Sequence, residues 1–127
     1  MHEFMLLIRN DIDHQASWPP DRHQKFLKAC EAYIGDLKKE AKLISAQPMV
    51  RQRTMLAKVK GQWKQAAFHE GKEVIVGYYH VLANDLNDAI AIAQRNPEFE
   101  FSDTARIEVR PIKMKEETTG FVYPDKR

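Results

Sequence analysis

Hydrophobic positions along the chain follow two periods, and their order predicts the order of the structural elements. Short apolar or alternating stretches, which are typical of strands, occupy Glu3–Arg9, Leu43–Val50, Val74–Leu82 and Thr104–Ile112. Between them, apolar residues recur at spacings of three and four, which predicts helices. One of roughly two dozen residues follows Pro20, and a shorter one begins at Asp85 and stops before Pro97.

Two more segments complete the predicted organisation of one domain over residues 1–127. Thr54–Val59 alternates and is followed by the turn Lys60–Gln62, which predicts an inserted hairpin. Residues 113–127 form a charged C-terminal tail, and its Phe121, Val122 and Tyr123 predict that it docks on the domain.

The predicted order is βαββαβ with an inserted hairpin, which indicates an α+β fold of the ferredoxin-like type. In that fold a four-stranded antiparallel sheet carries both helices on one face. The second face is left open, yet its central strands are too apolar for a surface that is fully in water. A homodimer that packs two open faces together is the simplest solution.

Composition narrows the classes of function. A chain of 127 residues with 43% hydrophobic and 30% charged residues is globular, and a net charge of +2 argues against nucleic-acid binding. No apolar run approaches the ~20 residues that cross a bilayer, and the first residues lack the basic region of a secretory signal. One cysteine excludes an intrachain disulfide, so we expect a cytoplasmic protein. The histidine spacing indicates no metal site, the scattered glycines indicate no phosphate loop, and no cofactor is predicted.

Charged side chains on the last predicted strand are candidate ligand contacts. Arg106, Glu108 and Arg110 alternate with apolar residues and therefore project from one face. On a free surface they form a solvated row of ion pairs. Enclosed by a dimer, they leave an excess of positive charge that suits a small anion, because arginine binds carboxylates in a bidentate manner. His80 is expected across from them, either as a ligand contact or as interface packing.

Further candidates come from the first helix and from the segment before the strongest strand. His23 lies on the apolar stripe of the helix and is either a general base or a histidine at the edge of the core. Glu70, Lys72 and Glu73 either contact a ligand or the partner subunit, or form an exposed charged turn. Cys30 lies in the same helical stripe as His23 and is expected to be buried, unreactive packing.

Several short motifs occur in the order found in one known family. They are Gly77–Ala83, Asp85–Leu86 with Ala89–Ile90, Asn96–Phe99 and Ile107–Ile112, and the segments Phe4–Ile8 and Leu43–Ala46 agree with them. Together they make the chain resemble the YCII-related (DGPF-type) family over nearly its whole length. The resemblance implies a ferredoxin-like dimeric α/β barrel. In a shorter branch of that family it implies a proposed catalytic His–Asp pair and elimination-type chemistry on polar aromatic compounds.

The motif that gives the family its second name is altered in this chain. Gln65–Phe68 stands where relatives read Asp-Gly-Pro-Phe, and Gly71 replaces the usual threonine, whereas Glu70, Lys72 and Glu73 match the positions that follow. The sequence therefore predicts a small homodimeric domain that binds a small polar or anionic molecule, with acid/base chemistry of the elimination or hydrolysis type. The alternative is a non-catalytic interaction or scaffold protein.

Overall fold

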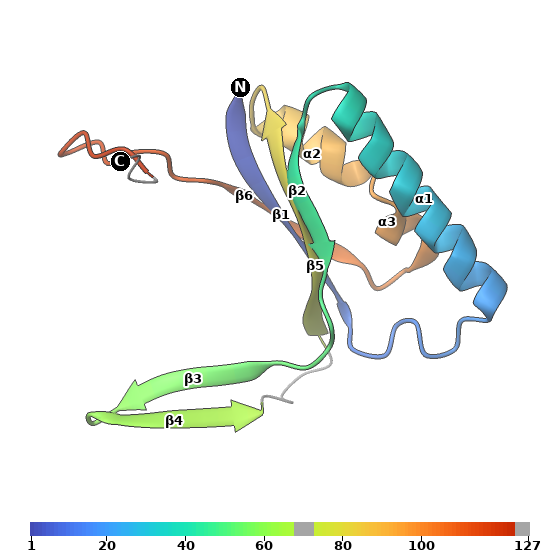
Figure 1. Cartoon of the computed structure of the whole chain (residues 1–127), viewed down its shortest axis with the longest axis horizontal. Coiled ribbons are helices and arrows are strands. Elements are labelled where there is room, and N and C mark those ends of the chain that lie inside the picture. The colour runs from blue at the N-terminus through green and yellow to red at the C-terminus, as the bar shows by residue number, and fades with distance from the viewer. Residues whose placement is uncertain (68–72, 124–127) are drawn as a thin grey trace.

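The computed structural model describes residues 1–67 and 73–123, and its body is a four-stranded antiparallel sheet with helices on one face (Figure 1). The strand order is β2-β5-β1-β6. The elements are β1 (His2–Asp11), α1 (Pro20–Lys39), β2 (Leu43–Pro48), β3 (Thr54–Val59), β4 (Gln62–Ala67), β5 (Glu73–Ala83), α2 (Leu86–Gln94), α3 (Pro97–Phe101) and β6 (Arg106–Pro111). The predicted α+β, ferredoxin-like order with an inserted hairpin is confirmed.

Alternation along β1 builds the core. Phe4, Leu6 and Ile8 are buried on the helix-covered face, and Leu37 of α1 and Ile92 of α2 pack over the sheet with at most 1% of their surfaces exposed. Each such side chain stabilises the fold by about 1.5–3 kcal/mol through removal of its apolar surface from water. The next inward-facing position of β1 is also buried, but its side chain is polar.

Helix α1 is shorter than predicted, with 20 residues instead of about two dozen. Its last turn closes when Lys42 N donates to Leu37 O at 2.9 Å and Ala41 N donates to Lys38 O at 3.0 Å. This pair of hydrogen bonds requires a left-handed residue after the helix, and Ala41 adopts it with a φ of 57°. Glycine usually occupies such a position, so the apolar alanine concealed the helix end in the sequence.

A β-bulge in β5 changes which side chains share a face. Ile8 pairs with Gly77 and Arg9 pairs with Ile75, so Val76 is an extra residue in the strand. Val76 is buried towards the helices. His80 lies instead on the open face, beside Glu3 of β1. Val76 and His80 are four residues apart and would share a face in a regular strand, but the bulge reverses the alternation and puts them on opposite faces.

Two segments extend away from the body on the side opposite the helices (Figure 1). We call β3 and β4 with their turn the arm (residues 54–67), and residues 113–123 the tail. The arm's strands form a separate two-stranded sheet closed by Lys60 and Gly61, which both have positive φ, as a tight hairpin turn requires. In the tail, Lys115 bridges to Val122, and the tail projects rather than docking on the domain.

None of the helices within residues 1–67 and 73–123 is long and apolar enough to span a membrane.

Candidate functional site

A cavity of about 540 Å³ lies between α1 and the helix-covered face of the sheet. This volume falls in the range of small-molecule sites, roughly 300–1,000 Å³. Phe26, Leu27 and Ile34 of α1 form one wall, and Ile8 and Val76 of the sheet form the other. The two walls are therefore apolar, and Asn96 and Glu98 are among the polar residues that complete the lining.

Asn96 supplies a buried hydrogen-bond donor to this cavity. Its Oδ1 caps α3 by accepting from Glu98 N at 2.9 Å, which fixes the orientation of the amide. Its Nδ2 is buried without a well-aligned acceptor among the described residues, although it lies beside the hydroxyls of Tyr33 and Tyr79, and the residue is only 4% exposed. A buried donor without an acceptor costs about 1–3 kcal/mol. A ligand oxygen in the cavity would remove this cost.

Cys30 and Tyr79 are neighbours in the lining of the cavity and are both protonated at neutral pH. Burial and the charge of Glu98 together raise the pKa of the Cys30 thiol to about 11, and a hydrogen bond with Tyr79 offsets part of this rise. Burial likewise raises the pKa of Tyr79 well above its ordinary value. Cys30 is half-buried on the cavity wall rather than fully buried in the core. The expectation of buried packing was therefore wrong, because the stripe of α1 that carries Cys30 faces a cavity.

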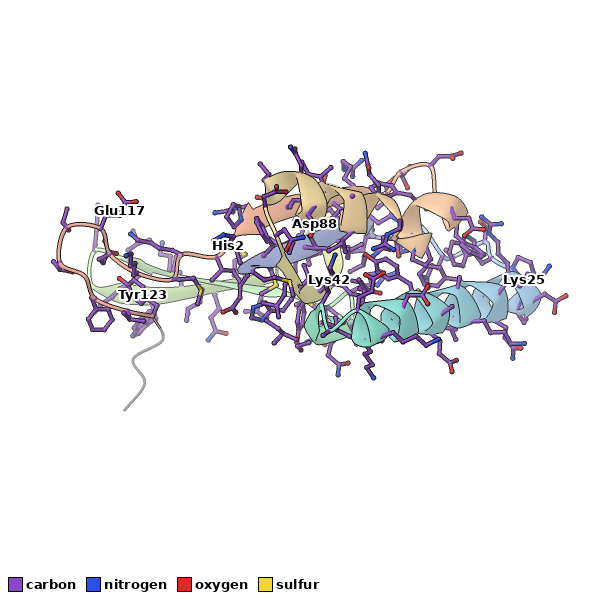
Figure 2. All side chains as sticks on the ribbon, turned by 90° about the horizontal axis from the view of Figure 1, so that it is seen from above. His2, Lys25, Lys42, Asp88, Glu117 and Tyr123 are labelled. Carbon is purple, nitrogen blue, oxygen red and sulfur yellow. The ribbon has the colours of Figure 1, made fainter. Side chains whose placement is uncertain are left out.

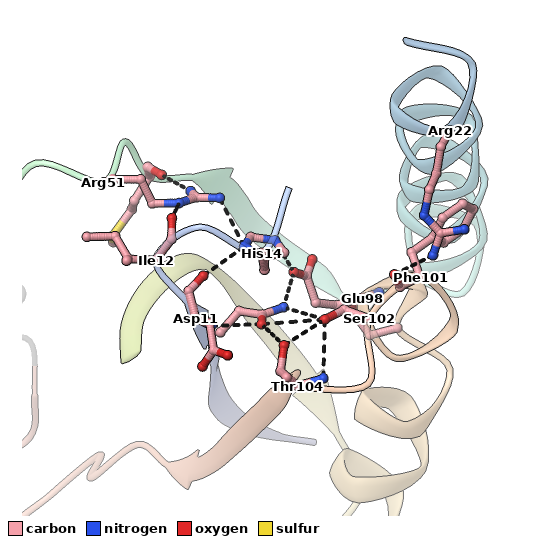
Figure 3. Close-up of polar contacts among 12 residues, drawn as sticks. Asp11, Ile12, His14, Arg22, Arg51, Glu98, Phe101, Ser102 and Thr104 are labelled. Carbon is pink, nitrogen blue, oxygen red and sulfur yellow. Dashed lines mark hydrogen bonds and ion pairs between the residues drawn. The ribbon is translucent and has the colours of Figure 1, made fainter. Parts of the chain in front are cut away.

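Glu98 is the buried carboxylate of the site (Figure 3). Asn10 at the end of β1 donates from Nδ2 to Glu98 Oε1 at 3.0 Å, and His14 Nε2 lies 3.0 Å from the same oxygen. Asn10 also accepts from Thr104 Oγ1 at 2.6 Å and is itself completely buried. No described residue makes a hydrogen bond to Oε2, and Glu98 lines the cavity. The carboxylate is thus held by one oxygen and available through the other.

His14 is oriented on both sides of its ring. Nδ1 lies 3.0 Å from Asp11 O and 3.2 Å from Arg51 Nη2, which can only donate. The Glu98 carboxylate next to Nε2 favours a proton on that nitrogen, so we assign Nδ1 as the acceptor from Arg51; in this tautomer Nδ1 makes no hydrogen bond with Asp11 O. The short Nε2–Oε1 distance lacks hydrogen-bond alignment, so the contact is an electrostatic one between side chains that are 2% and 7% exposed.

His23, the general base suggested by the sequence, lies at the mouth of the cavity. It lines the opening but is exposed, and its ring packs obliquely against Trp18 with centroids 6.4 Å apart. Trp18 in turn packs edge-on against Phe26, with centroids 5.3 Å apart. No described residue orients His23 through a hydrogen bond. Its catalytic role stays a prediction.

Arg106, Glu108 and Arg110 do lie together on the open face of the sheet, as predicted. Glu108 binds Arg9 at 2.9 Å and Arg110 at 3.1 Å, and these two hydrogen-bonding partners lower the pKa of its carboxyl. Arg106 binds Glu73 at 2.9 Å. Each arginine of this network thus has a carboxylate partner from the chain itself.

His80 and Arg110 lie on the same row of the open face, because both pair with Met5 in the register. His80 Nε2 is 2.7 Å from Glu3 Oε1. Glu70 and Lys72 lie outside the described residues, whereas Glu73 joins the open-face network. A ligand at this network stays a prediction, and the geometry favours the helix-side cavity.

Neither the tail nor a cluster of metal-ligating side chains offers a second candidate site among the described residues. A depression of about 630 Å³ lies along the tail, but a single turn of chain with mostly exposed side chains forms it. In the part of the chain that the structure describes, no three His, Cys, Asp or Glu side chains are placed to hold a metal ion.

Asn10, His14, Asn96 and Glu98 were missed from the sequence. One signal was available for Asn10, since it continues the inward-facing alternation Phe4, Leu6 and Ile8 of a strand whose other inward positions are apolar. The remaining three lie in a loop and at a helix start, where no period marks burial.

The fold and the cavity define a ferredoxin-like α+β domain with a cavity of small-molecule size between its long helix and its sheet. A profile of the YCII-related domain matches residues 2–113, and the chain therefore belongs to the YCII-related domain family. The family resemblance seen in the sequence is confirmed. A search of curated proteins found no significant match.

Proposed function

We propose that this protein binds a small polar molecule in the cavity between α1 and the sheet. The observation that carries the proposal is the buried Asn96 Nδ2, a donor without a well-aligned acceptor in the lining of the cavity. Tyr79 adds a second protonated group, and Glu98 adds an acceptor. A ligand that fits has an apolar body against Phe26 and Ile34 and a polar end with both an acceptor and a donor.

Glu98 is the side chain best placed to exchange a proton with such a ligand. Asn10 and His14 hold one carboxylate oxygen from behind, so the group is oriented without being closed off from the cavity. General base catalysis requires this combination of orientation and contact with the ligand. Acid/base chemistry of the elimination or hydrolysis type is therefore the reaction that the site supports. A scaffold protein remains the alternative.

Alkylation of Cys30 tests where a ligand binds. Compounds that raise the melting temperature are first selected from a library of small polar molecules, because binding to the native state alone stabilises it. Without ligand, we expect Cys30 to react about a hundredfold more slowly than in the unfolded chain, since its pKa of about 11 is two units above the ordinary value of 9.0. A stabilising compound should slow the reaction at least a further tenfold.

A matched control places a thiol on the other face of the same helix. Ala32→Cys in a Cys30→Ser background puts the thiol on an exposed position of α1, and its reactivity should not respond to the compound. A compound that stabilises the protein and leaves Cys30 reactivity unchanged would place its site elsewhere and refute the proposal. Failure of a broad library to yield any stabilising compound would favour the scaffold alternative.

We also propose that two copies associate through their open sheet faces. The helices cover only one face (Figure 1), and the other carries Met5, Leu7 and Leu82, which are only partly buried in a single protomer. Light scattering at micromolar concentration should report about twice the chain mass of 14.8 kDa. A mass of one chain at these concentrations would contradict the homodimer.

A further inference from the structure

The arm exposes more apolar surface than a free hairpin tolerates. Among the residues that the structure describes, its two strands form a sheet with each other alone, and every residue of β3 is exposed. Met55 and Val59 project from one face of the ribbon, and Leu56 and Trp63 from the other, with exposed fractions of 42–67%. A two-stranded ribbon is marginally stable alone in water. Apolar groups on both faces therefore indicate that the arm packs against another surface.

Charge separates the arm from the rest of the molecule. The arm carries three lysines, Lys58, Lys60 and Lys64, and no acidic residue. Because the whole chain has a net charge of +2, the rest of the chain carries −1. Lys58 Nζ lies 5.3 Å from the centre of the Trp63 ring, so the tip combines a cation with an aromatic surface. The body of this same chain is thus the opposite in charge to its own arm.

The position of the arm shows where its partner lies. The arm and the tail both extend on the side of the open sheet face, away from the helices (Figure 1), and Figure 2 shows Glu117 and Tyr123 of the tail at the end of the molecule opposite Lys25 of α1. Phe121 and Val122 of the tail are also about half exposed. The arm, the tail and the open sheet face all carry accessible apolar groups, and they border the same region beside the sheet.

We propose that the arm of each protomer packs against the body of a second copy of this chain, whose open face is seated on the first. This inference rests on the homodimer proposed above and adds the surface that completes it. The negative body of the second copy complements the positive arm, and its apolar surface covers the arm's Leu56 and Trp63. A nucleic acid would neutralise the lysines, but its phosphates would leave the aliphatic residues on both faces exposed.

The fluorescence of Trp63 tests the proposal directly. Trp18→Phe leaves Trp63 as the only tryptophan, and Trp63 is 67% exposed in a single protomer. In the dimer we expect its emission to lie at shorter wavelength and acrylamide quenching to be several-fold weaker. Both should revert on dilution, in step with the mass measured by light scattering. A dimer in which Trp63 keeps the emission of a water-exposed indole would overturn the proposal.

Paired leucine variants compare the arm with the helix side of the body. Leu56→Ala in the arm should raise the dimer dissociation constant at least about tenfold, as truncation of a buried interface side chain does. Leu86→Ala on α2 is the matched control and should leave the dissociation constant unchanged, since Leu86 is similarly exposed but lies on the helix side. Circular dichroism checks that both variants are folded.

The outcomes distinguish the two proposals. A wild-type monomer refutes the homodimer and the arm contact together. A wild-type dimer that Leu56→Ala does not weaken refutes the arm contact alone. Trp63 emission that responds to added single-stranded DNA, and not to protein concentration, would identify a nucleic acid as the partner and also refute the arm contact.

Discussion

Asn10→Ala should lower the free energy of unfolding by about 3–5 kcal/mol, the largest single-residue effect that we expect on stability. Asn10 donates to Glu98 and accepts from Thr104 while completely buried. Removing it leaves the buried Glu98 carboxylate with only its contact to His14 and leaves the backbone N–H of Asp11 without its side-chain acceptor. Loss of one partner of a buried charge costs this much because the remaining charge stays desolvated.

Chemical denaturation and thermal unfolding measure this effect, and the melting temperature should fall by roughly 10–20 °C. Thr104→Val is the matched control, since it removes one of the hydrogen bonds to Asn10 from an exposed residue and should cost only about 1 kcal/mol. Equal losses in the two variants would show that the buried cluster does not carry the stability assigned to it.

Cys30→Trp should abolish ligand binding in the cavity. The indole extends from the wall of α1 into a space of about 540 Å³ and occupies the end where Asn96 and Tyr79 present their polar groups. Binding should weaken at least about a hundredfold, because steric exclusion of the polar end removes several contacts of about 1 kcal/mol each. Isothermal calorimetry with a compound that protects Cys30 measures the change.

The control for this variant is Ala32→Trp, which puts the same side chain on the exposed face of α1. Its ligand affinity should equal that of the wild type. Ligand-dependent stabilisation that persists in Cys30→Trp would mean that the compound binds outside the cavity, for example at the charged network of the open face.

The body of the fold could be read from the sequence because its signals are local. The strands show apolar or alternating stretches, α2 is marked by its cap Asp85, and the hairpin by Lys60–Gly61. The bulge in β5 escaped because Val74–Val76 is apolar throughout, so one extra residue leaves no break in the pattern. The bulge becomes apparent only when β5 is paired with the shorter β1 in the sheet.

The candidate site could be predicted only in part. The open-face network of Arg106, Glu108 and Arg110 follows from alternation within one strand, so the sequence sufficed to place these residues together. The pair Asn10 and Glu98 is 88 residues apart and meets through packing of α3 against the end of the sheet. Such a contact has no local period, and only the anomalous polarity of an inward-facing residue hints at it.

Gly77 sets the spacing between β5 and β2 at the wall of the cavity. A Cβ at this position would lie 3.0 Å from Gln47 O, so any larger residue would push β2 outward. Because β2 is an edge strand and borders the cavity through Gln47 and Pro48, it can move without disturbing the central strands. A side chain at position 77 would therefore widen the cavity through the spacing of two backbones and leave the buried Asn96 and Glu98 in place.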